Sequence, residues 1–257
     1  MPSTAADSLA GRPARPPVFI AAAADLAGDH LTLRGQEGRH ASTVRRLMAG
    51  ERADLTDGAG MVAECVVDAA RPNELELTVL SRRTEPRPQP QLVVLQAIPK
   101  GDRGELAVEL LTEVGADVIV PWAAERCVAV WRGERAAKSR ARWSSAAEQA
   151  AKQSRRIWFP EVTEQAGLAA ATSRIAAAAS AILLDPDAQV PVTGVPLPPD
   201  GEIVLIVGPE GGIAPREDEA FRAAGAVPAR LGPTVLRAST AGVVAAATVL
   251  SRSGRWA

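Results

Sequence analysis

A run of three glycines, two prolines and one glutamate, "VGPEGGIAP" at residues 207–215, directly follows an apolar stretch. Glycine loses more conformational freedom on folding than any other residue, so such a run indicates either a tight turn or close backbone approach to a ligand. Glu210 would repel a phosphate, and neither the G-x-G-x-x-G nor the G-x-x-x-x-G-K-[ST] fingerprint is present. The run therefore favours a neutral or cationic ligand over a phosphate, with a purely structural turn as the alternative.

A second loop of similar composition, "RLGPTVLR" at residues 230–237, precedes a helix rich in small residues. In an open parallel α/β sheet, ligands bind beyond the carboxyl ends of the strands. Two glycine-proline loops at neighbouring strand ends would close around one ligand from both sides. These two loops are the candidate binding site of the chain.

The elements that must position the loops are strands alternating with helices. Apolar runs predict buried strands at residues 92–98, 117–122, 181–185 and 202–207, and helices are expected at residues 104–115, 138–156, 173–180, 215–225 and 239–252. The first helix carries Leu106, Leu110 and Val114 at helical spacing and ends at Gly115. Continuous apolar strands alternating with helices indicate a parallel sheet covered on both faces.

The N-terminal part of the sequence has a different, β-rich character. Short alternating runs occupy residues 30–33, 52–56, 61–67 and 74–80, and "DGAG" between the second and third predicts a hairpin. A short helix is expected at residues 39–50, so this part is predicted to be a small barrel with one helix. A proline-spaced polar connector begins at Arg82. We therefore divide the chain into a flexible tail at 1–16, a barrel domain at 17–86 and an α/β domain at 87–257.

Composition and charge narrow the class of protein. The chain has 257 residues, of which 47% are hydrophobic. Its net charge of −1 argues neither for nor against nucleic-acid binding. Residues 131–156 carry eight basic side chains against two acidic ones, which indicates either a phosphate-facing patch or a solvated helix face. Cys65 and Cys127 are isolated, so no zinc site or disulfide is expected. No signal peptide or membrane span is recognised, and we expect a cytoplasmic protein without a metal.

Several segments, in the same order along the chain, resemble one enzyme family. "GPEGG" followed by a helix, then "LG", then "VLR..TA" before a small-residue helix resembles the C-terminal end of SPOUT-class RNA methyltransferases, and within that class the RsmE family. "KGDR" at 100–103, "TEVGADVIVPW" at 112–122 and "EQAAKQSRR" at 148–156 agree with this family. "RHASTVRRLMAGERADLTDGAG" at 39–60 is similar to its PUA-like RNA-binding domain. The resemblance covers roughly residues 15–255.

The resemblance implies a fold and an activity that the pattern of residues alone does not give. It implies a SPOUT-type parallel sheet with a C-terminal deep trefoil knot, preceded by a PUA-like β-barrel. It also implies a homodimer that uses S-adenosylmethionine to methylate N3 of a uridine in 16S ribosomal RNA of the small subunit. Two alternatives stay open: a SPOUT enzyme that methylates another atom, such as a ribose 2′-hydroxyl, and a non-catalytic RNA-binding assembly factor. A Rossmann-type nucleotide-binding protein is disfavoured because its fingerprint is missing.

The resemblance also implies roles for particular residues. The cofactor-binding positions it gives are Leu184, Val207, Gly208, Glu210, Gly211, Gly212, Ile213, Leu231, Gly232, Leu236, Arg237 and Thr240. The RNA-binding positions are His40, Arg45, Arg46, Lys100, Arg103, Arg155 and Arg156, with a capping or surface role as the alternative for His40.

Arg237 is the candidate catalytic residue. N3 of uracil must lose its proton before it attacks a methyl group, and the negative charge then spreads onto O2 and O4. A fixed cation beside these oxygens would stabilise that charge; the alternative is that Arg237 pairs with Glu210 to brace the two loops. The family commonly has "LRTETA" where this chain has "LRASTA", with Ser239 in place of the carboxylate, and the usual lysine of "KATELG" is absent. We therefore assign no general base.

Overall fold

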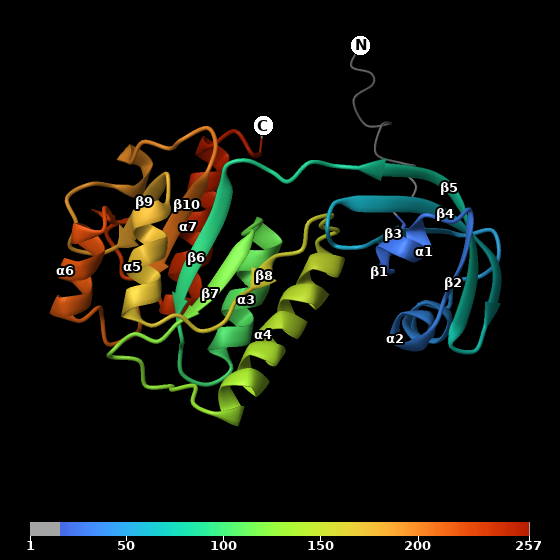
Figure 1. Ribbon diagram of the computed structural model, residues 1–257, viewed down its shortest axis with the longest axis horizontal. Coiled ribbons are helices and arrows are strands. Elements are labelled where there is room, and N and C mark those ends of the chain that lie inside the picture. Colours follow the sequence, from blue (N-terminus) through green and yellow to red (C-terminus); the bar gives the residue numbers. More distant parts are fainter. Residues whose placement is uncertain (1–15, 257) are drawn as a thin grey trace, which may run out of the picture. The chain divides into compact units, whose positions relative to one another are not determined.

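The computed structural model describes residues 16–256, so the predicted tail at 1–16 lies, but for its last residue, outside the described residues. The chain divides into two compact units, Met1–Glu85 and Pro86–Ala257 (Figure 1). Each unit has its own buried core, and the two are described separately below.

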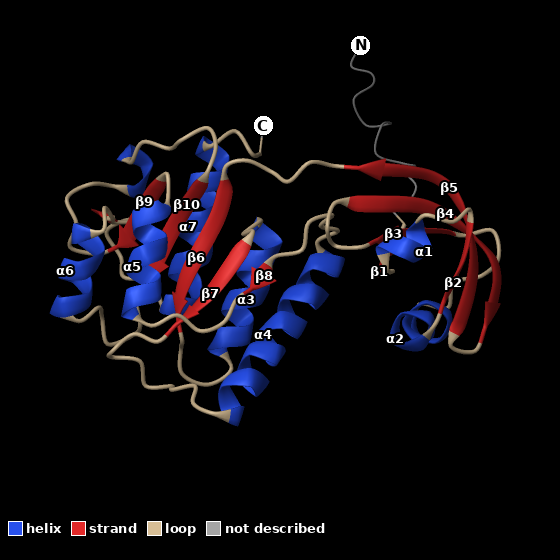
Figure 2. Cartoon of the chain, viewed as in Figure 1, coloured by secondary structure: helices blue, strands red, loops and turns tan. Residues whose placement is uncertain are grey.

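The first unit is built on a five-stranded sheet with the strand order β1-β3-β4-β5-β2. Its elements are β1 (Val18–Ile20), α1 (Ala23–Leu26), β2 (His30–Leu33), α2 (Gly35–Arg39), the π-helical turn η1 (His40–Val44), β3 (Arg52–Thr56), β4 (Met61–Arg71) and β5 (Glu74–Thr84). The long strands β4 and β5 bend, so the sheet curls (Figure 2). In the described part of the chain β1 and β2 are the two edge strands, so this is a curled open sheet rather than the closed barrel that was predicted.

Local structure in this unit follows the sequence pattern in part. The hairpin is confirmed, because β3 pairs antiparallel with β4 through residues that flank "DGAG". The helix predicted at 39–50 is wrong in its bounds: helical structure begins at Gly35 and ends at Val44. Arg46 then has a positive φ of 56°, which a helix cannot contain. The connector predicted from Arg82 also begins too early, since β5 runs on to Thr84.

The second unit contains a six-stranded, entirely parallel sheet with the order β11-β9-β10-β6-β7-β8. Its strands are β6 (Gln91–Ala97), β7 (Val118–Trp122), β8 (Glu161–Val162), β9 (Ser180–Leu184), β10 (Glu202–Val207) and β11 (Val227–Ala229). Its helices are α3 (Arg103–Val114), α4 (Glu134–Gln153), α5 (Leu168–Ala177), the 3-10 turn η2 (Val192–Gly194), α6 (Pro215–Ala223) and α7 (Ala238–Arg252). The predicted parallel α/β sheet is confirmed.

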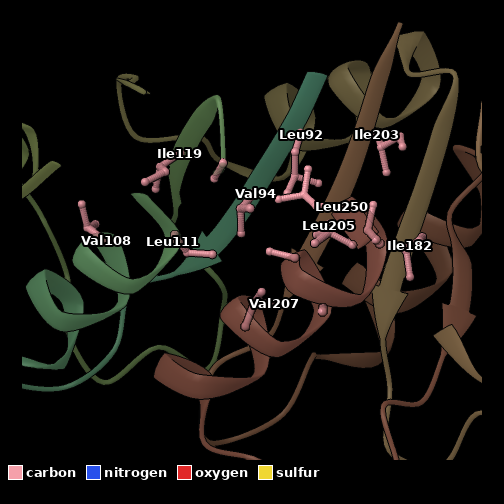
Figure 3. Close-up of a cluster of buried hydrophobic side chains, with 14 of the residues drawn as sticks. Leu92, Val94, Val108, Leu111, Ile119, Ile182, Ile203, Leu205, Val207 and Leu250 are labelled. Atoms are coloured by element: carbon pink, nitrogen blue, oxygen red, sulfur yellow. The ribbon is translucent and has the colours of Figure 1, made fainter. Parts of the chain in front are cut away.

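Two hydrophobic cores cover the two faces of this sheet, because successive residues of a strand point to opposite faces. On one face, Leu92 of β6 and Leu205 of β10 pack with Leu250 of α7 and with side chains of α3 (Figure 3). Side chains of α4 belong to the same core. On the other face, Val93 of β6 packs with Phe221 of α6 and with side chains of α5. The strands are buried on both sides, and this explains why they appear in the sequence as unbroken apolar runs.

The buried face of α3 differs from the predicted one. Leu106 is 46% exposed, and the buried residues of the helix are Gly104, Ala107, Val108, Leu111 and Thr112. A Cβ on Gly104 would lie 2.7 Å from Nε1 of Trp143 in α4, so a glycine is needed where the two helices meet. Helix α3 thus buries Gly104 and Ala107 beside Val108 and Leu111, and the two small residues carry little signal in a hydrophobicity pattern. Its end at Gly115, with a φ of 113°, is as predicted.

Two other helices begin earlier than predicted. Helix α4 starts at Glu134 after Gly133, whose positive φ of 53° sets the entry to the helix, and it ends at Gln153 rather than at 156. Helix α5 starts at Leu168, five residues before the predicted 173, directly after Gly167 in an extended conformation. The first turn of α4 holds polar and small residues, and three alanines follow Leu168 in α5, so neither start gives an apolar helical pattern.

Candidate functional site

A cavity of about 780 Å³ lies at the carboxyl ends of β9, β10 and β11. It is bordered by the two glycine loops, which are the first loop (residues 208–214, between β10 and α6) and the second loop (residues 230–237, between β11 and α7). The volume is in the range of small-molecule and cofactor sites. The place is also the expected one, since ligands of parallel α/β sheets bind beyond the carboxyl ends of the strands.

The cavity brings together most of the residues that the sequence assigned to a cofactor. Ten of the twelve line it, namely Leu184, Val207, Gly208, Glu210, Gly212, Ile213, Leu231, Gly232, Leu236 and Arg237. Gly211 and Thr240 do not line it. The other lining residues were not singled out from the sequence; they include Asp185, Asp187, Asp218 and Arg222, and also Thr234, Val235, Ala238 and Ala241.

Each glycine of the first loop is needed for a different structural reason. Gly212 has a positive φ of 74°, a conformation that other residues rarely adopt. A Cβ on Gly208 would lie 2.8 Å from Cγ1 of Ile213 within the same loop. A Cβ on Gly211 would lie 3.2 Å from Cβ of Arg126, on the segment that follows β7. A tight turn and close backbone approach therefore both occur, and the close approach at Gly211 is to another segment of the chain.

The lining of the cavity carries more negative than positive charge. Four carboxylates (Asp185, Asp187, Glu210 and Asp218) face two guanidinium groups (Arg222 and Arg237). Arg222 pairs with Asp218 at 2.7 Å and with Asp185 at 3.3 Å. The hydrogen bond to Asp218 is the main reason why the pKa of Arg222 is raised above its ordinary value. The remaining negative charge suits a ligand that carries a cation and disfavours a phosphate.

Arg237 is the N-cap residue of α7. Its side chain is exposed, and its carbonyl oxygen accepts the backbone N–H groups of Thr240 and Ala241 at 2.8 Å. Among residues 16–256 it forms no ion pair, so the alternative in which Arg237 pairs with Glu210 is wrong. The guanidinium of Arg237 is therefore available to a substrate. Ser239, which replaces the family's carboxylate, is buried with 6% exposure.

In the first unit, the predicted RNA-binding residues lie on and after η1. His40 is half-buried and packs edge-on against Phe19, with the ring centroids 5.8 Å apart. Arg45 and Arg46 follow the turn and are exposed. The two arginines are exposed to solvent, while the packing of His40 against Phe19 gives this histidine a structural contact.

In the second unit, Lys100 and Arg103 are exposed before and at the start of α3, and Arg155 is exposed after α4. The interpretation of Arg156 as an RNA-binding residue is contradicted by its contacts. Its side chain is 11% exposed, and its guanidinium donates to the carbonyl oxygens of Trp158 and Thr112 and pairs with buried Asp117 at 3.5 Å. Burial lowers the pKa of Arg156 to about 10, so it remains charged at neutral pH beside Asp117. Arg156 is a structural cation.

The tryptophans of the second unit divide into core and partly exposed residues. Trp122 is fully buried against Phe221, and Trp143 is buried against Trp131. Trp158 is half-buried, with the guanidinium of Arg87 5.6 Å from the centre of its ring. Trp122 and Trp143 are therefore packing residues of the core.

In residues 16–256 no cluster of histidine, cysteine, aspartate and glutamate has the arrangement of a metal site. No helix in the same range is long and apolar enough to cross a membrane. Cys65 and Cys127 are both free thiols.

Comparison with known proteins matches both units to one enzyme family. Residues 85–250 match the family described as an RNA methyltransferase domain, and residues 33–80 match an RNA methyltransferase PUA domain. The chain is 45% identical, over 226 residues and 86% of each chain, to the ribosomal RNA small subunit methyltransferase E of Mycobacterium bovis. It is 26% identical to the protein of the same name from Bacillus subtilis, over 85% of this chain and 88% of that one.

A solved structure agrees with the fold. The ribosomal RNA small subunit methyltransferase E of Neisseria gonorrhoeae, solved bound to S-adenosyl methionine, superposes with a TM-score of 0.81 at 26% identity, over 92% of this chain and 98% of that one. The sequence motifs, the parallel sheet and these matches agree on one assignment. The chain belongs to the ribosomal RNA small subunit methyltransferase E family of RNA methyltransferases.

Proposed function

We propose that this protein transfers a methyl group from S-adenosylmethionine to N3 of a uridine in the 16S ribosomal RNA of the small subunit. The observation that carries the proposal is the cavity between the two glycine loops, which ten of the twelve expected cofactor residues line. Relatives that match most of the chain are named ribosomal RNA small subunit methyltransferase E, and one is solved bound to S-adenosyl methionine. The cytoplasm, where ribosomes are assembled, would be its place of action.

The charge of the cavity lining and its mixture of apolar and hydrogen-bonding groups suit the cofactor. S-adenosylmethionine carries a sulfonium and an ammonium group, and the excess of carboxylates over guanidinium groups in the lining would stabilise both. Apolar side chains such as Leu184, Leu231 and Leu236 would contact the adenine, while the exposed backbone of the glycine loops supplies hydrogen-bonding groups. When bound, the cofactor supplies an electrophilic methyl group on sulfur.

Within this site Arg237 has the role of stabilising charge on the base. The N3 proton leaves before or during attack, and the guanidinium stabilises the charge that develops on O2 or O4. The side chain of Arg237 is exposed and forms no ion pair with any residue in the range 16–256, which leaves its donors available for these oxygens. Alignment of N3 with the methyl group would provide much of the remaining acceleration. Because the uridine lies in folded RNA, it is turned outward to reach the site.

We propose that residues 17–86 act as a PUA-like RNA-binding domain and residues 87–257 as the methyltransferase domain. In the first, Arg45 and Arg46 contact phosphates; in the second, Lys100, Arg103 and Arg155 do so. Phosphate contacts position the RNA without determining its sequence.

We further propose a homodimer whose site is completed by the partner chain. Apolar side chains of the second unit support this, since Leu106 on α3 is 46% exposed, Val244 on α7 is 39% exposed and Val235 in the second loop is 80% exposed. Helices α3 and α7 pack against each other, so Leu106 and Val244 lie on adjacent helices. Sedimentation of the protein alone tests this, and a monomer at micromolar concentration would contradict it.

The C-terminal segment is proposed to form the deep trefoil knot of SPOUT enzymes. The segment between β9 and β10 lies against the chain that leads into α7, since Val192 N donates to Arg230 O at 2.9 Å. The same segment also lies against the end of α7, since Arg252 donates to the carbonyl oxygens of Val192 and Val195 at 3.0 and 2.9 Å. These contacts are what a chain end held within a loop requires. A crystal structure with a continuous backbone through residues 185–252 would test the threading.

The decisive experiment is methylation of small ribosomal subunits, and of naked 16S RNA, from a strain that lacks this activity. The methylated nucleotide is mapped by mass spectrometry. We expect one uridine to gain a methyl group at N3, with small subunits the better substrate. A methyl group on a ribose would support the 2′-hydroxyl alternative, and RNA binding without cofactor binding would support the assembly-factor alternative.

A further inference from the structure

A segment outside the cavity is attached to the first loop through a buried carboxylate. Glu217, in the first turn of α6, is 4% exposed and accepts two backbone N–H groups with its two oxygens. Oε2 accepts from Ala214 at 3.1 Å, at the end of the first loop, and Oε1 accepts from Glu125 at 2.7 Å. One side chain therefore ties the end of the first loop to residues 123–127, the segment that follows β7, which we call the brace.

The brace also contacts the middle of the first loop. Arg126 Nη1 donates to the carbonyl oxygen of Gly211 at 3.3 Å. The backbones approach so closely there that a Cβ on Gly211 would lie 3.3 Å from the carbonyl oxygen of Arg126. Neither Arg126 nor Gly211 lines the cavity, so this contact is on the outer side of the loop.

The brace is itself fixed to the sheet. Ala123 N donates at 3.0 Å to the carbonyl oxygen of Ala166, which is bridged to Trp122 at the end of β7. Within the brace, Cys127 N donates to Ala124 O at 3.0 Å. Ala124 is buried in the core beneath α6. The brace is thus a fixed element, and its contacts with Ala214 through Glu217 and with Gly211 through Arg126 limit where the first loop can move.

We propose that the brace holds the first loop in the shape that binds the cofactor, with Glu217 and Arg126 as positioning residues. The inference rests on the proposed function, because it takes the cavity as the S-adenosylmethionine site. Cofactor affinity then depends on a segment that makes no contact with the cavity. A ligand that needs the loop in one shape binds more weakly when the loop samples several.

The test is calorimetric titration of S-adenosylmethionine into wild type and variants, followed by steady-state kinetics on small ribosomal subunits. Arg126→Ala removes one hydrogen bond and is expected to raise Kd about fivefold. Glu217→Gln keeps the shape of the side chain but turns an amide NH₂ toward one of the two N–H groups, and about a tenfold rise is expected. Arg132→Ala is the matched control. It removes an exposed arginine from the segment between β7 and α4 and should leave Kd unchanged.

Two features separate positioning from a merely structural role. Positioning raises Kd and the KM for the cofactor while kcat at saturating cofactor stays within about twofold, whereas partial unfolding lowers the number of binding sites without changing Kd. Gly211→Ala should also raise Kd. In the double variant with Arg126→Ala, the rise in Kd should be smaller than the product of the rises in the two single variants, because both substitutions break the same contact.

The outcomes are distinct. If Arg126→Ala and Glu217→Gln bind the cofactor as tightly as wild type does, the brace has no positioning role and this inference is overturned while the proposed function stands. If wild type itself does not bind S-adenosylmethionine, the proposed function falls and this inference with it.

Discussion

The two loops that border the cavity are similar in composition but are held in different ways. The first loop has hydrogen bonds at both ends and in the middle: Gly212 N donates to Pro209 O, Gly211 O accepts from Arg126, and Ala214 N donates to Glu217. In the described part of the chain, residues 231–236 of the second loop form no hydrogen bond. One wall of the cavity is fixed before a ligand arrives, while the other can adjust to it.

The largest effect should come from Arg237, the exposed cation at the end of the second loop. Arg237→Ala is expected to lower kcat by about 10² to 10³, the usual cost of removing one group that stabilises developing charge. The melting temperature should not change, because the side chain is exposed and makes no ion pair. Single-turnover methylation of small ribosomal subunits measures the first quantity and calorimetry the second. A loss of activity below tenfold would remove Arg237 from the chemistry.

The next prediction tests how firmly the first loop is held in place. Glu217→Ala leaves the N–H groups of Glu125 and Ala214 without their acceptor and should lower the free energy of unfolding by about 3 kcal/mol. Glu219→Ala, which removes an exposed carboxylate from the same helix, should change it by less than about 0.5 kcal/mol. Urea denaturation compares the two. Equal values for both variants would mean that Glu217 does not hold the end of the first loop.

A matched pair of glycine substitutions compares the loops directly. Gly212→Ala forces an alanine into a φ of 74° and should cost about 1 kcal/mol of stability. Gly232→Ala, in the second loop, has open space around the new methyl group and no positive φ, so its stability should stay the same or rise slightly. Thermal melts of both variants give the answer, and a larger loss at Gly232 would reverse the comparison.

The smallest effect concerns the thiol of Cys127, which lies behind the first loop. Burial raises the pKa of Cys127, and the charges of Glu210 and Glu217 raise it further. Glu210→Gln removes one of these charges, so the pKa should fall and the thiolate fraction at pH 8 should rise by about twofold. The rate of maleimide labelling, read on the Cys127 peptide, follows that fraction. Slower labelling in the variant would contradict the sign. Cys65 serves as an internal reference, because burial raises its pKa to about 11.

The sequence predicted the framework of the site well and its supports poorly. Unbroken apolar runs located β6, β9 and β10, and glycine and proline located the two loops, because these signals are local. Asp117 pairs with Arg156 and with Arg255, which lie far from it in the sequence, so charge alone suggested that Arg156 was exposed. The brace was missed for the same reason, since Arg126 and Gly211 meet only in the fold.

The packing of α3 was mispredicted for a different reason. Hydrophobicity patterns weight large side chains, and they placed Leu106 in the core. The structure instead buries Gly104 and Ala107, because Trp143 of α4 needs the space that small residues leave. The proposed knot and the proposed homodimer have no local signal in the sequence, and both proposals come from the resemblance to a family.

The position of the cavity along the chain has a consequence for biosynthesis. Every residue that lines it lies between Leu183 and Ala241, and α7, which closes the core beneath it, ends at Arg252. The five strands of the first unit all precede Glu85 and leave the ribosome first. A nascent chain can therefore fold its N-terminal unit long before the cavity exists. The cavity can form only after α7 has also been synthesised.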